Sequence, residues 1–170
     1  YLPLEWVADL VAAARSQGLP PSLVAAIARQ ESTFDPRARS SAGAVGVLQL
    51  MPATARGHAR ALGLGLRPDL TDPALNLRLG SRELATLIRR FGAVEPALAA
   101  YNAGETRVRA WWRRWPDREV FVESIPIPET CTYVRRVMFL DTVENTTPTG
   151  GGGGVDTGGG GGGKPKPPKK

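Results

Sequence analysis

The most informative residue of the sequence is Glu31, which stands where an amphipathic helix is expected to end. Steps of three and four residues from Val24 continue one apolar helical face as far as this glutamate. Burial in such surroundings disfavours an ionised carboxyl group and raises its pKa, so the group can keep its proton near neutral pH. It could then serve as a general acid on a neutral polymer such as a sugar chain. The alternative is a structural carboxylate that pairs with an arginine, such as Arg37 or Arg39.

The segment after this glutamate could form one wall of a binding groove. Gly43 and Gly46 lack a Cβ, which allows backbone and ligand to approach closely. Gln49 and Met51 then alternate with two leucines, so that one pair can face a groove while the other packs inward. Gln49 would bind hydroxyl or amide groups, and Met51 would lie against the apolar face of a sugar. A glycine-rich turn followed by a core strand is the structural alternative.

Two later stretches add groups that could contact a sugar. Tyr101 and Asn102 stand together at an expected helix end, where the amide could bind an acetamido group and the phenol could stabilise positive charge. Glu129 follows an Ile-Pro-Ile-Pro run and is the other carboxylate in a motif-like setting. The structural alternatives are a helix end with Gly104 in the left-handed conformation, and a glutamate that suits the positive end of a helix dipole.

The single cysteine, Cys131, and the single histidine, His58, restrict other chemistries. One cysteine cannot form an intrachain disulfide, and the two residues supply too few ligands for a zinc site of the usual kind. His58 lies in a polar stretch, so we expect it on the surface rather than in a catalytic site.

The elements that must hold these groups have a helical period almost throughout, which predicts an all-α fold with at most a minor hairpin near residues 43–50. The alternation at Val120-Phe121-Val122 is too short to indicate a strand. The expected helices are a stripe from Trp6 to Ala14, a helix capped by Ser22, one that begins at Pro52, one from Asp72 to Gly92, one from Glu95 to Gly104, a basic and aromatic one from Arg107 to Trp115, and a last one opened by Glu129.

Composition divides the chain into a globular domain at residues 1–145 and a tail at residues 146–170. The tail is rich in glycine, ends in lysine and proline, and holds no aromatic residue, so it cannot bury enough apolar surface to offset its ordering entropy. We therefore expect it to be disordered. Its four lysines, less the charge of Asp156, supply +3 of the net charge of +6, which would suit any polyanion or simply keep the chain soluble.

No apolar run approaches the length of a transmembrane helix, about 20 residues. The chain begins with Tyr1 rather than methionine, so we expect a cut or processed N-terminus and no signal sequence in this chain. Trp111, Trp112 and Trp115 stand among arginines. They could stack on sugars or nucleic acid, but core tryptophans with arginines that extend to solvent are the preferred interpretation.

Four stretches, in this order, resemble the catalytic domain of soluble lytic transglycosylases, the goose-lysozyme-related enzymes of bacterial cell walls. The family pattern ES…GLMQ…AYN is matched by Glu31-Ser32, by residues 46–49 and by residues 100–102, and the pattern IPxxETRxYVxxV is matched by residues 125–137. The resemblance covers residues 4–142 and implies a lysozyme-like fold of about seven to eight helices around a glycan-binding groove. Two departures are Val47-Leu48 in place of Leu-Met, and Cys131 in place of the usual arginine.

The resemblance implies that Glu31 is the sole catalytic acid and base. It implies cleavage of the β-1,4 bond between N-acetylmuramic acid and N-acetylglucosamine without water, assisted by the substrate's acetamido group and ending in a 1,6-anhydro ring. No cofactor or metal is implied. The partners would be peptidoglycan glycan strands in the cell envelope, either periplasmic or exported, and we expect a monomer. The residues implied to line the glycan groove are Ser40, Gln49, Met51, Tyr101, Asn102, Glu129 and Tyr133.

Three alternatives stay open at this point. One is a hydrolytic muramidase on the same fold, which would add water instead of closing the ring. Another is a non-catalytic module that binds the cell wall, suggested by the Cys131 departure and the tail. The third is nucleic-acid binding, which rests on charge alone; we expect no specific nucleic-acid partner and only weak retention by the tail.

Overall fold

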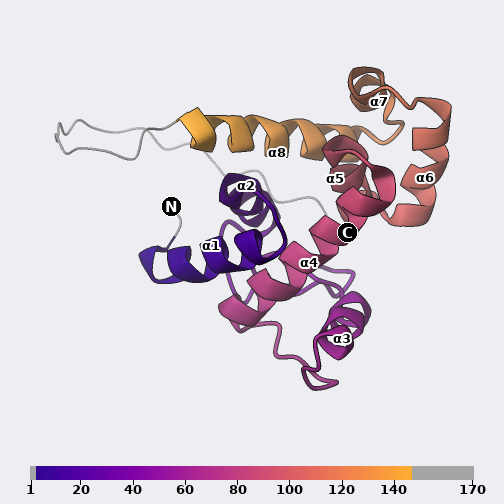
Figure 1. Ribbon diagram of the computed structural model, residues 1–170. Helices are drawn as coiled ribbons and strands as arrows, with labels where there is room; N and C mark the ends of the chain where they lie inside the picture. Colours follow the sequence, from indigo (N-terminus) through magenta and orange to yellow (C-terminus); the bar gives the residue numbers. More distant parts are fainter. Residues whose placement is uncertain (1–2, 147–170) are drawn as a thin grey trace, which may run out of the picture.

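The part of the chain that the computed structural model describes, residues 3–146, is built from α-helices (Figure 1). This confirms the all-α prediction, and β structure within these residues is limited to isolated bridges at Arg39–Val45 and Val45–Leu50. The predicted tail lies outside the described residues, apart from Thr146 at the end of the last helix. A short 3-10 helix at Leu4–Trp6 is followed by α1 (Val7–Ser16), α2 (Pro21–Ser32), α3 (Pro52–Ala61), α4 (Pro73–Phe91), α5 (Val94–Ala103), α6 (Glu105–Arg114), α7 (Arg118–Ser124) and α8 (Pro128–Thr146).

The long helix α4 confirms the prediction at both of its ends. The Asp72 side chain accepts hydrogen bonds from the backbone N–H groups of Ala74 and Leu75, and Pro73 takes the first helical position. Gly92 ends the helix in the left-handed conformation, with φ 74° and ψ 6°. Local sequence chemistry therefore sets both ends of this helix.

One local prediction is wrong, one structural alternative does not hold, and one helix was missed. The helix α2 begins at Pro21, whose fixed φ suits the first turn, and the buried Ser22 hydroxyl has no hydrogen-bond partner among the described residues instead of capping the helix. Gly104 has a positive φ of 93° but a ψ of 141°, so it lies outside the left-handed helical region. The helix α7 was missed: Asp117 caps it by accepting a bond from the backbone N–H of Val120 at 2.9 Å, which the brief alternation of the sequence concealed.

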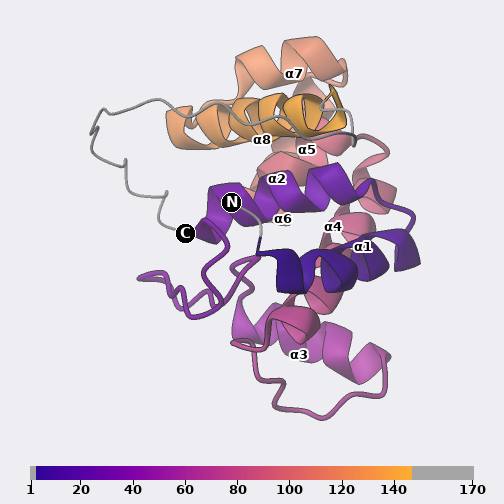
Figure 2. The same cartoon turned by 90° about the vertical axis from the view of Figure 1, so that its left-hand side faces the viewer.

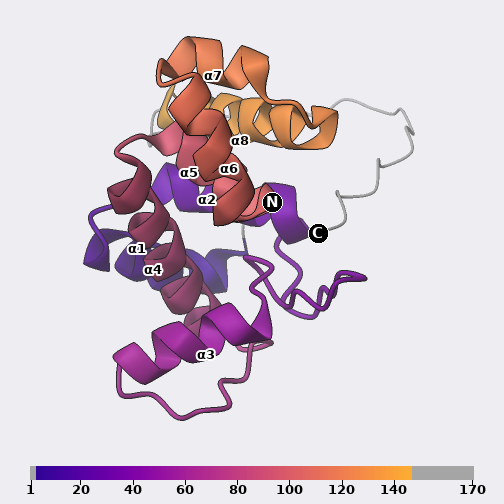
Figure 3. The same ribbon diagram turned by 90° about the vertical axis from the view of Figure 1, so that its right-hand side faces the viewer.

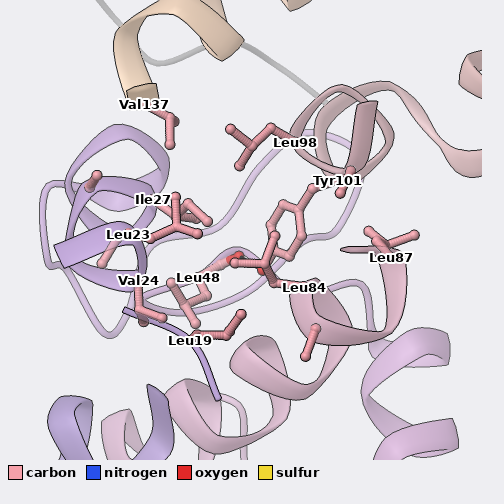
Figure 4. Packing of buried hydrophobic residues seen from close by; sticks show 14 of the residues in the cluster. Leu19, Leu23, Val24, Ile27, Leu48, Leu84, Leu87, Leu98, Tyr101 and Val137 are labelled. Atoms are coloured by element: carbon pink, nitrogen blue, oxygen red, sulfur yellow. Dashed lines mark hydrogen bonds between the residues drawn. The ribbon is translucent and has the colours of Figure 1, made fainter. Parts of the chain in front are cut away.

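The main core is centred on α2, which lies against α8 (Figures 1 and 2). Figure 4 shows Val24 and Ile27 of α2 packed beside Leu48, a residue of the loop between α2 and α3. The preferred interpretation of the tryptophans holds for two of the three, since Trp111 and Trp112 pack against this core and Trp112 meets the Phe121 ring edge to face at 5.3 Å.

A smaller apolar cluster joins α3 to α4, which lie side by side in Figure 3. The loop between α2 and α3 contributes to both clusters and therefore runs from the main core to the smaller one. The buried members of the smaller cluster are Val45, Leu50, Ala55, Ala59, Leu70 and Leu79.

Candidate active site

Glu31 lies in the last turn of α2 and is only 7% exposed, as its spacing predicted. The helix ends just beyond it because Thr33 and Phe34 both have a positive φ, at 53° and 62°. Consecutive non-glycine residues in the left-handed region are rare and energetically unfavourable. They turn the chain sharply away from the α2 axis, so the acidic side chain sits at an abrupt helix end.

Tyr133 of α8 is the partner that the structure brings to this glutamate. Its hydroxyl donates a hydrogen bond to Oε1 of Glu31 at 3.0 Å, and its side chain is 1% exposed. The two residues are far apart in the sequence and meet because α2 packs against α8. Glu31 is therefore a buried carboxyl group with a phenol donor.

The loop between α2 and α3 is held by side chains from its own ends. Ser32 donates to the carbonyl oxygens of Ala28 at 3.2 Å and of Val47 at 2.8 Å. Gln49 donates through Nε2 to the carbonyl oxygens of Ala38 at 3.0 Å and of Gly46 at 2.9 Å. Both N–H groups of the Gln49 amide thus hold the loop backbone, whereas the sequence predicted that this side chain would contact a sugar.

Asn76 of α4 fixes the same loop from the other side and was missed by the sequence analysis. It is fully buried, its Oδ1 accepts from the backbone N–H of Leu48 at 2.8 Å, and its Nδ2 donates to the carbonyl oxygens of Val45 and Leu70, both at 2.9 Å. A signal was present, because position 76 continues the apolar face of α4 and a buried asparagine must find partners for its amide.

Tyr101, near the end of α5, donates its hydroxyl to the Leu48 carbonyl oxygen at 2.7 Å. Its ring points from α5 towards Leu48 and Leu84 in Figure 4. Burial, and then the negative charges of Glu31 and Glu83, raise the pKa of Tyr101 well above its ordinary value. Both carboxylates therefore lie within electrostatic range of this phenol.

The pKa of Tyr133 is also raised well above its ordinary value. Burial is the largest cause, followed by the charge of Glu31, the nearby Tyr101 and the hydrogen bond to Glu31. Ionising a buried phenol next to a carboxylate is unfavourable, so Tyr133 keeps its proton at neutral pH. It can therefore act as a hydrogen-bond donor to Glu31 in either protonation state of the carboxyl group.

These raised pKa values predict a loss of stability in alkali. Above pH 10 the tyrosines ionise in the unfolded chain but not in the folded one, so the unfolded state binds fewer protons and the free energy of unfolding falls as the pH rises. The fall should approach about 1.4 kcal/mol per pH unit for each of the two tyrosines. Urea denaturation at several values between pH 9 and 11 measures it.

The matching variant is Tyr133→Phe, which removes one of the two buried phenols. It should lower the free energy of unfolding at pH 8, where the hydrogen bond to Glu31 is lost, but its free energy should fall less steeply above pH 10 than that of the parent. Equal alkaline slopes for the two proteins would show that Tyr133 ionises as easily in the folded state as in the unfolded one.

A cavity of about 680 Å³, called the groove from here on, lies between α3, α4 and the end of α5. Four residues expected at the site line it: Gln49, Met51, Tyr101 and Asn102. Glu31 does not line it, but its interaction with Tyr101 places it next to the groove wall. The volume is within the usual range for small-molecule sites, about 300–1,000 Å³.

The structure does not bring Ser40 or Glu129 into the groove. The Ser40 hydroxyl accepts a hydrogen bond from the backbone N–H of Ala44 at 3.0 Å, which closes a turn. Glu129 is exposed in the first turn of α8, although its neighbour Thr130 donates to Oδ1 of Asn102 at 2.9 Å. Cys131 contacts the Val122 carbonyl oxygen through its sulfur at 3.4 Å, outside the groove.

One face of α4 lines the groove with polar groups that the sequence analysis did not single out. Glu83, Thr86 and Arg90 follow each other at spacings of three and four residues, a signal that the apolar stripe of the same helix masked. His58 of α3 also lines the groove, with its side chain 14% exposed, so it is more enclosed than its polar sequence surroundings indicated.

At the far end of this stripe, Arg90 donates to Oε2 of Glu105 at 2.5 Å, and Arg109 donates to the other oxygen of Glu105. Burial acts to raise the pKa of Glu105, but the hydrogen bonds and charges of the two arginines outweigh it, so the pKa lies below its ordinary value. Glu105 is therefore a charged, fully engaged carboxylate and is unsuited to donate a proton.

Within residues 3–146, no group of three or more histidine, cysteine, aspartate or glutamate side chains is placed to hold a metal ion. In the same part of the chain, no helix combines the length and the apolar character needed to cross a membrane.

The helical architecture, with a buried glutamate at a helix end beside a groove, defines a lysozyme-like all-α domain. Residues 10–121 match the family model of the transglycosylase SLT domain, and the chain belongs to this family. The family suggested by the four sequence motifs is thereby confirmed.

Relatives and solved structures agree with this assignment. The chain is 39% identical over 130 residues to the soluble lytic murein transglycosylase of Escherichia coli (strain K12), a match that covers 72% of this chain and 20% of the relative. It is 39% identical over 101 residues to the transglycosylase of Enterobacteria phage PRD1, which covers 59% of this chain and 36% of that protein.

Among solved structures, an inactive glutamate-to-glutamine mutant of the lytic transglycosylase Slt from Pseudomonas aeruginosa superposes with a TM-score of 0.76 at 39% identity. The match covers 83% of this chain and 24% of that one. The chain thus spans about a fifth of the length of its E. coli relative.

Proposed function

We propose that this chain carries a peptidoglycan lytic transglycosylase domain, which cleaves the β-1,4 bond between N-acetylmuramic acid and N-acetylglucosamine without water. The observation that carries the proposal is the buried Glu31, bound by Tyr133 at 3.0 Å and next to a groove lined by Tyr101 and Asn102. Membership of the SLT family, whose relatives are named lytic murein transglycosylases, supports the proposed reaction.

In the proposed reaction, protonated Glu31 gives its proton to the oxygen of the glycosidic bond as that bond breaks. The leaving sugar departs as an alcohol, and the substrate's own acetamido oxygen forms a bond to the anomeric carbon. Tyr133 donates a hydrogen bond to the carboxylate formed on Glu31, which stabilises its charged form. No second protein carboxylate is needed to stabilise the cation.

The second half of the reaction returns the proton. The Glu31 carboxylate removes the proton from the C6 hydroxyl group of the N-acetylmuramic acid. The C6 oxygen of this sugar then displaces the acetamido oxygen from its anomeric carbon. A 1,6-anhydro ring closes, Glu31 is protonated again, and no water is consumed. Because one group acts as acid and then as base, its position beside the groove must remain the same in both steps.

The proposal assigns glycan contacts to Met51, Tyr101 and Asn102, together with Gln49 as part of the groove wall. Tyr133 would act through Glu31 rather than on the glycan. Ser40 and Glu129 would contact only a glycan strand that extends beyond the groove. Cell-envelope location follows from the proposed substrate, and a monomer would suffice because one chain contains the acid and the groove.

Product analysis tests the proposed reaction. Digestion of purified peptidoglycan followed by mass spectrometry should give fragments that end in 1,6-anhydromuramic acid, 18 Da lighter than the hydrolysis products because no water is added. Reducing ends would instead establish the hydrolytic muramidase alternative. Binding to peptidoglycan without any release of fragments would establish a non-catalytic wall-binding module.

The hydrolytic alternative has one structural observation in its favour. Glu83 provides a further carboxylate in the groove, and a hydrolase of the inverting class uses a second carboxylate to activate water. The contact of Glu83 with His58 points to a different use.

A further inference from the structure

The groove contains an imidazole–carboxylate pair that the proposed mechanism does not use. Nε2 of His58 in α3 lies 2.6 Å from Oε2 of Glu83 in α4, and both residues line the groove. The side chains are 14% and 23% exposed, so the pair is shielded from bulk solvent but open to a ligand. The two side chains are therefore within hydrogen-bond distance of each other.

The two helices that carry the pair are also joined by apolar packing. The smaller apolar cluster already joins α3 to α4 through buried residues that include Ala55, Ala59 and Leu79. An ion pair near the surface typically contributes little to stability. A role in the groove explains better why a carboxylate and an imidazole line it.

We propose that Glu83 is a glycan-binding residue that determines specificity in the groove, and that His58 is its positioning residue. This inference rests on the proposed function. A carboxylate accepts hydrogen bonds on two oxygens, and among residues 3–146 His58 is the only hydrogen-bond partner of the Glu83 side chain. The remaining acceptor capacity suits the hydroxyl groups and the acetamido N–H of an N-acetylated sugar.

The location of Glu83 indicates which part of a glycan it would meet. Glu83 and Tyr101 both line the groove, and the charges of Glu83 and Glu31 both raise the pKa of Tyr101, so Glu83 lies on the side of the groove nearest the acid. From Glu83 the polar stripe of α4 continues through Thr86 to Arg90, about 10 Å along the helix axis. A stripe of that length suits consecutive sugar units rather than a single small molecule.

The test measures binding in a Glu31→Gln background, in which the proposed reaction cannot consume the ligand. The probe is a tetramer of β-1,4-linked N-acetylglucosamine, titrated by calorimetry. Adding Glu83→Gln should raise the Kd about tenfold or more, because a charged hydrogen-bond acceptor is lost. In the chain with Glu31 intact, Glu83→Gln should raise KM for soluble glycan strands by more than it lowers kcat.

The role of His58 is tested by two substitutions. His58→Leu removes the donor that orients Glu83 and should raise the Kd severalfold. His58→Gln retains an N–H donor and should restore binding to within about threefold of the parent. If His58 had a purely structural role, two variants with the same melting temperature would bind the tetramer equally well, and His58→Gln would show no recovery over His58→Leu. If Glu83→Gln itself lowers the melting temperature, the difference in Kd between the two His58 variants shows whether an oriented Glu83 contributes to binding.

The matched control is Glu123→Gln, which neutralises a carboxylate paired with Arg135 at 2.5 Å on the exposed surface of α7 and α8. It should leave the Kd unchanged. If this control raised the Kd as much as Glu83→Gln does, the effect would be one of overall charge and the inference would be overturned. Unaltered binding by Glu83→Gln would overturn the inference alone and leave the proposed function standing. Failure of the Glu31→Gln parent to bind the tetramer would overturn both.

Discussion

Replacing Glu31 by glutamine is expected to lower the rate of peptidoglycan cleavage on the order of 1,000-fold or more. Glutamine has nearly the same size and can still accept the Tyr133 hydrogen bond, so the fold should be retained. It cannot give a proton to the leaving oxygen or take one from the C6 hydroxyl group. The decrease in turbidity of a cell-wall suspension measures the rate, and co-sedimentation with the same walls should show that binding persists.

Glu95→Gln is the control for this experiment. Glu95 is 6% exposed, comparable to Glu31, but it lies in α5 and pairs with Arg118 at 2.8 Å, and it does not line the groove. Its substitution should leave cleavage per folded molecule close to that of the parent. A Glu31→Gln protein that still clears the suspension would refute the assignment of Glu31 as the acid.

Gly46→Ala is expected to produce the largest loss of stability among simple substitutions near the site. Gly46 has a φ of 83°, and a Cβ there would lie 2.2 Å from both Nδ2 of Asn76 and the carbonyl oxygen of Leu70. The Leu70 oxygen belongs to the backbone and cannot move aside alone. Strain and the loss of the Asn76 hydrogen bonds should together cost about 3 kcal/mol or more in the free energy of unfolding.

Urea denaturation followed by circular dichroism measures this loss, with Gly57→Ala as the control. Gly57 lies inside α3, and a Cβ there would meet no other atom within 4 Å. Alanine in a helix is favoured over glycine, so the control should be stabilised by about 0.5–1 kcal/mol. Similar destabilisation by the two alanines would show that the contacts around Gly46 are not the cause.

Much of the fold could be predicted because helix limits depend on local chemistry. Asp72, Pro73 and Gly92 define α4 through a cap, a fixed φ and a positive φ, all of which can be recognised in a short window of sequence. The helix α7 could not be found in this way. Its seven residues are too few to show a helical period, and Phe121 is buried only because of the tertiary packing.

The candidate site was predictable only in part. The burial of Glu31 follows from its spacing within α2, whereas Tyr133 was implied at the site only by the resemblance of the late motif to the family pattern, and its hydrogen bond to Glu31 was not predicted. The pairing of His58 with Glu83 depends on how α3 packs on α4, which local patterns do not reveal. Ser40, implied by the resemblance, instead closes a turn outside the groove.

Leu48 has a consequence for how a sugar chain could reach the acid. Its N–H is held by Asn76 of α4, its carbonyl oxygen is held by Tyr101 of α5, and its side chain is part of the main core. A segment anchored in three directions cannot swing aside as a flap without disrupting the interior of the domain. A polysaccharide must therefore enter the cavity through the opening that is already present. The loop around Leu48 then has the same conformation before and after the ligand binds.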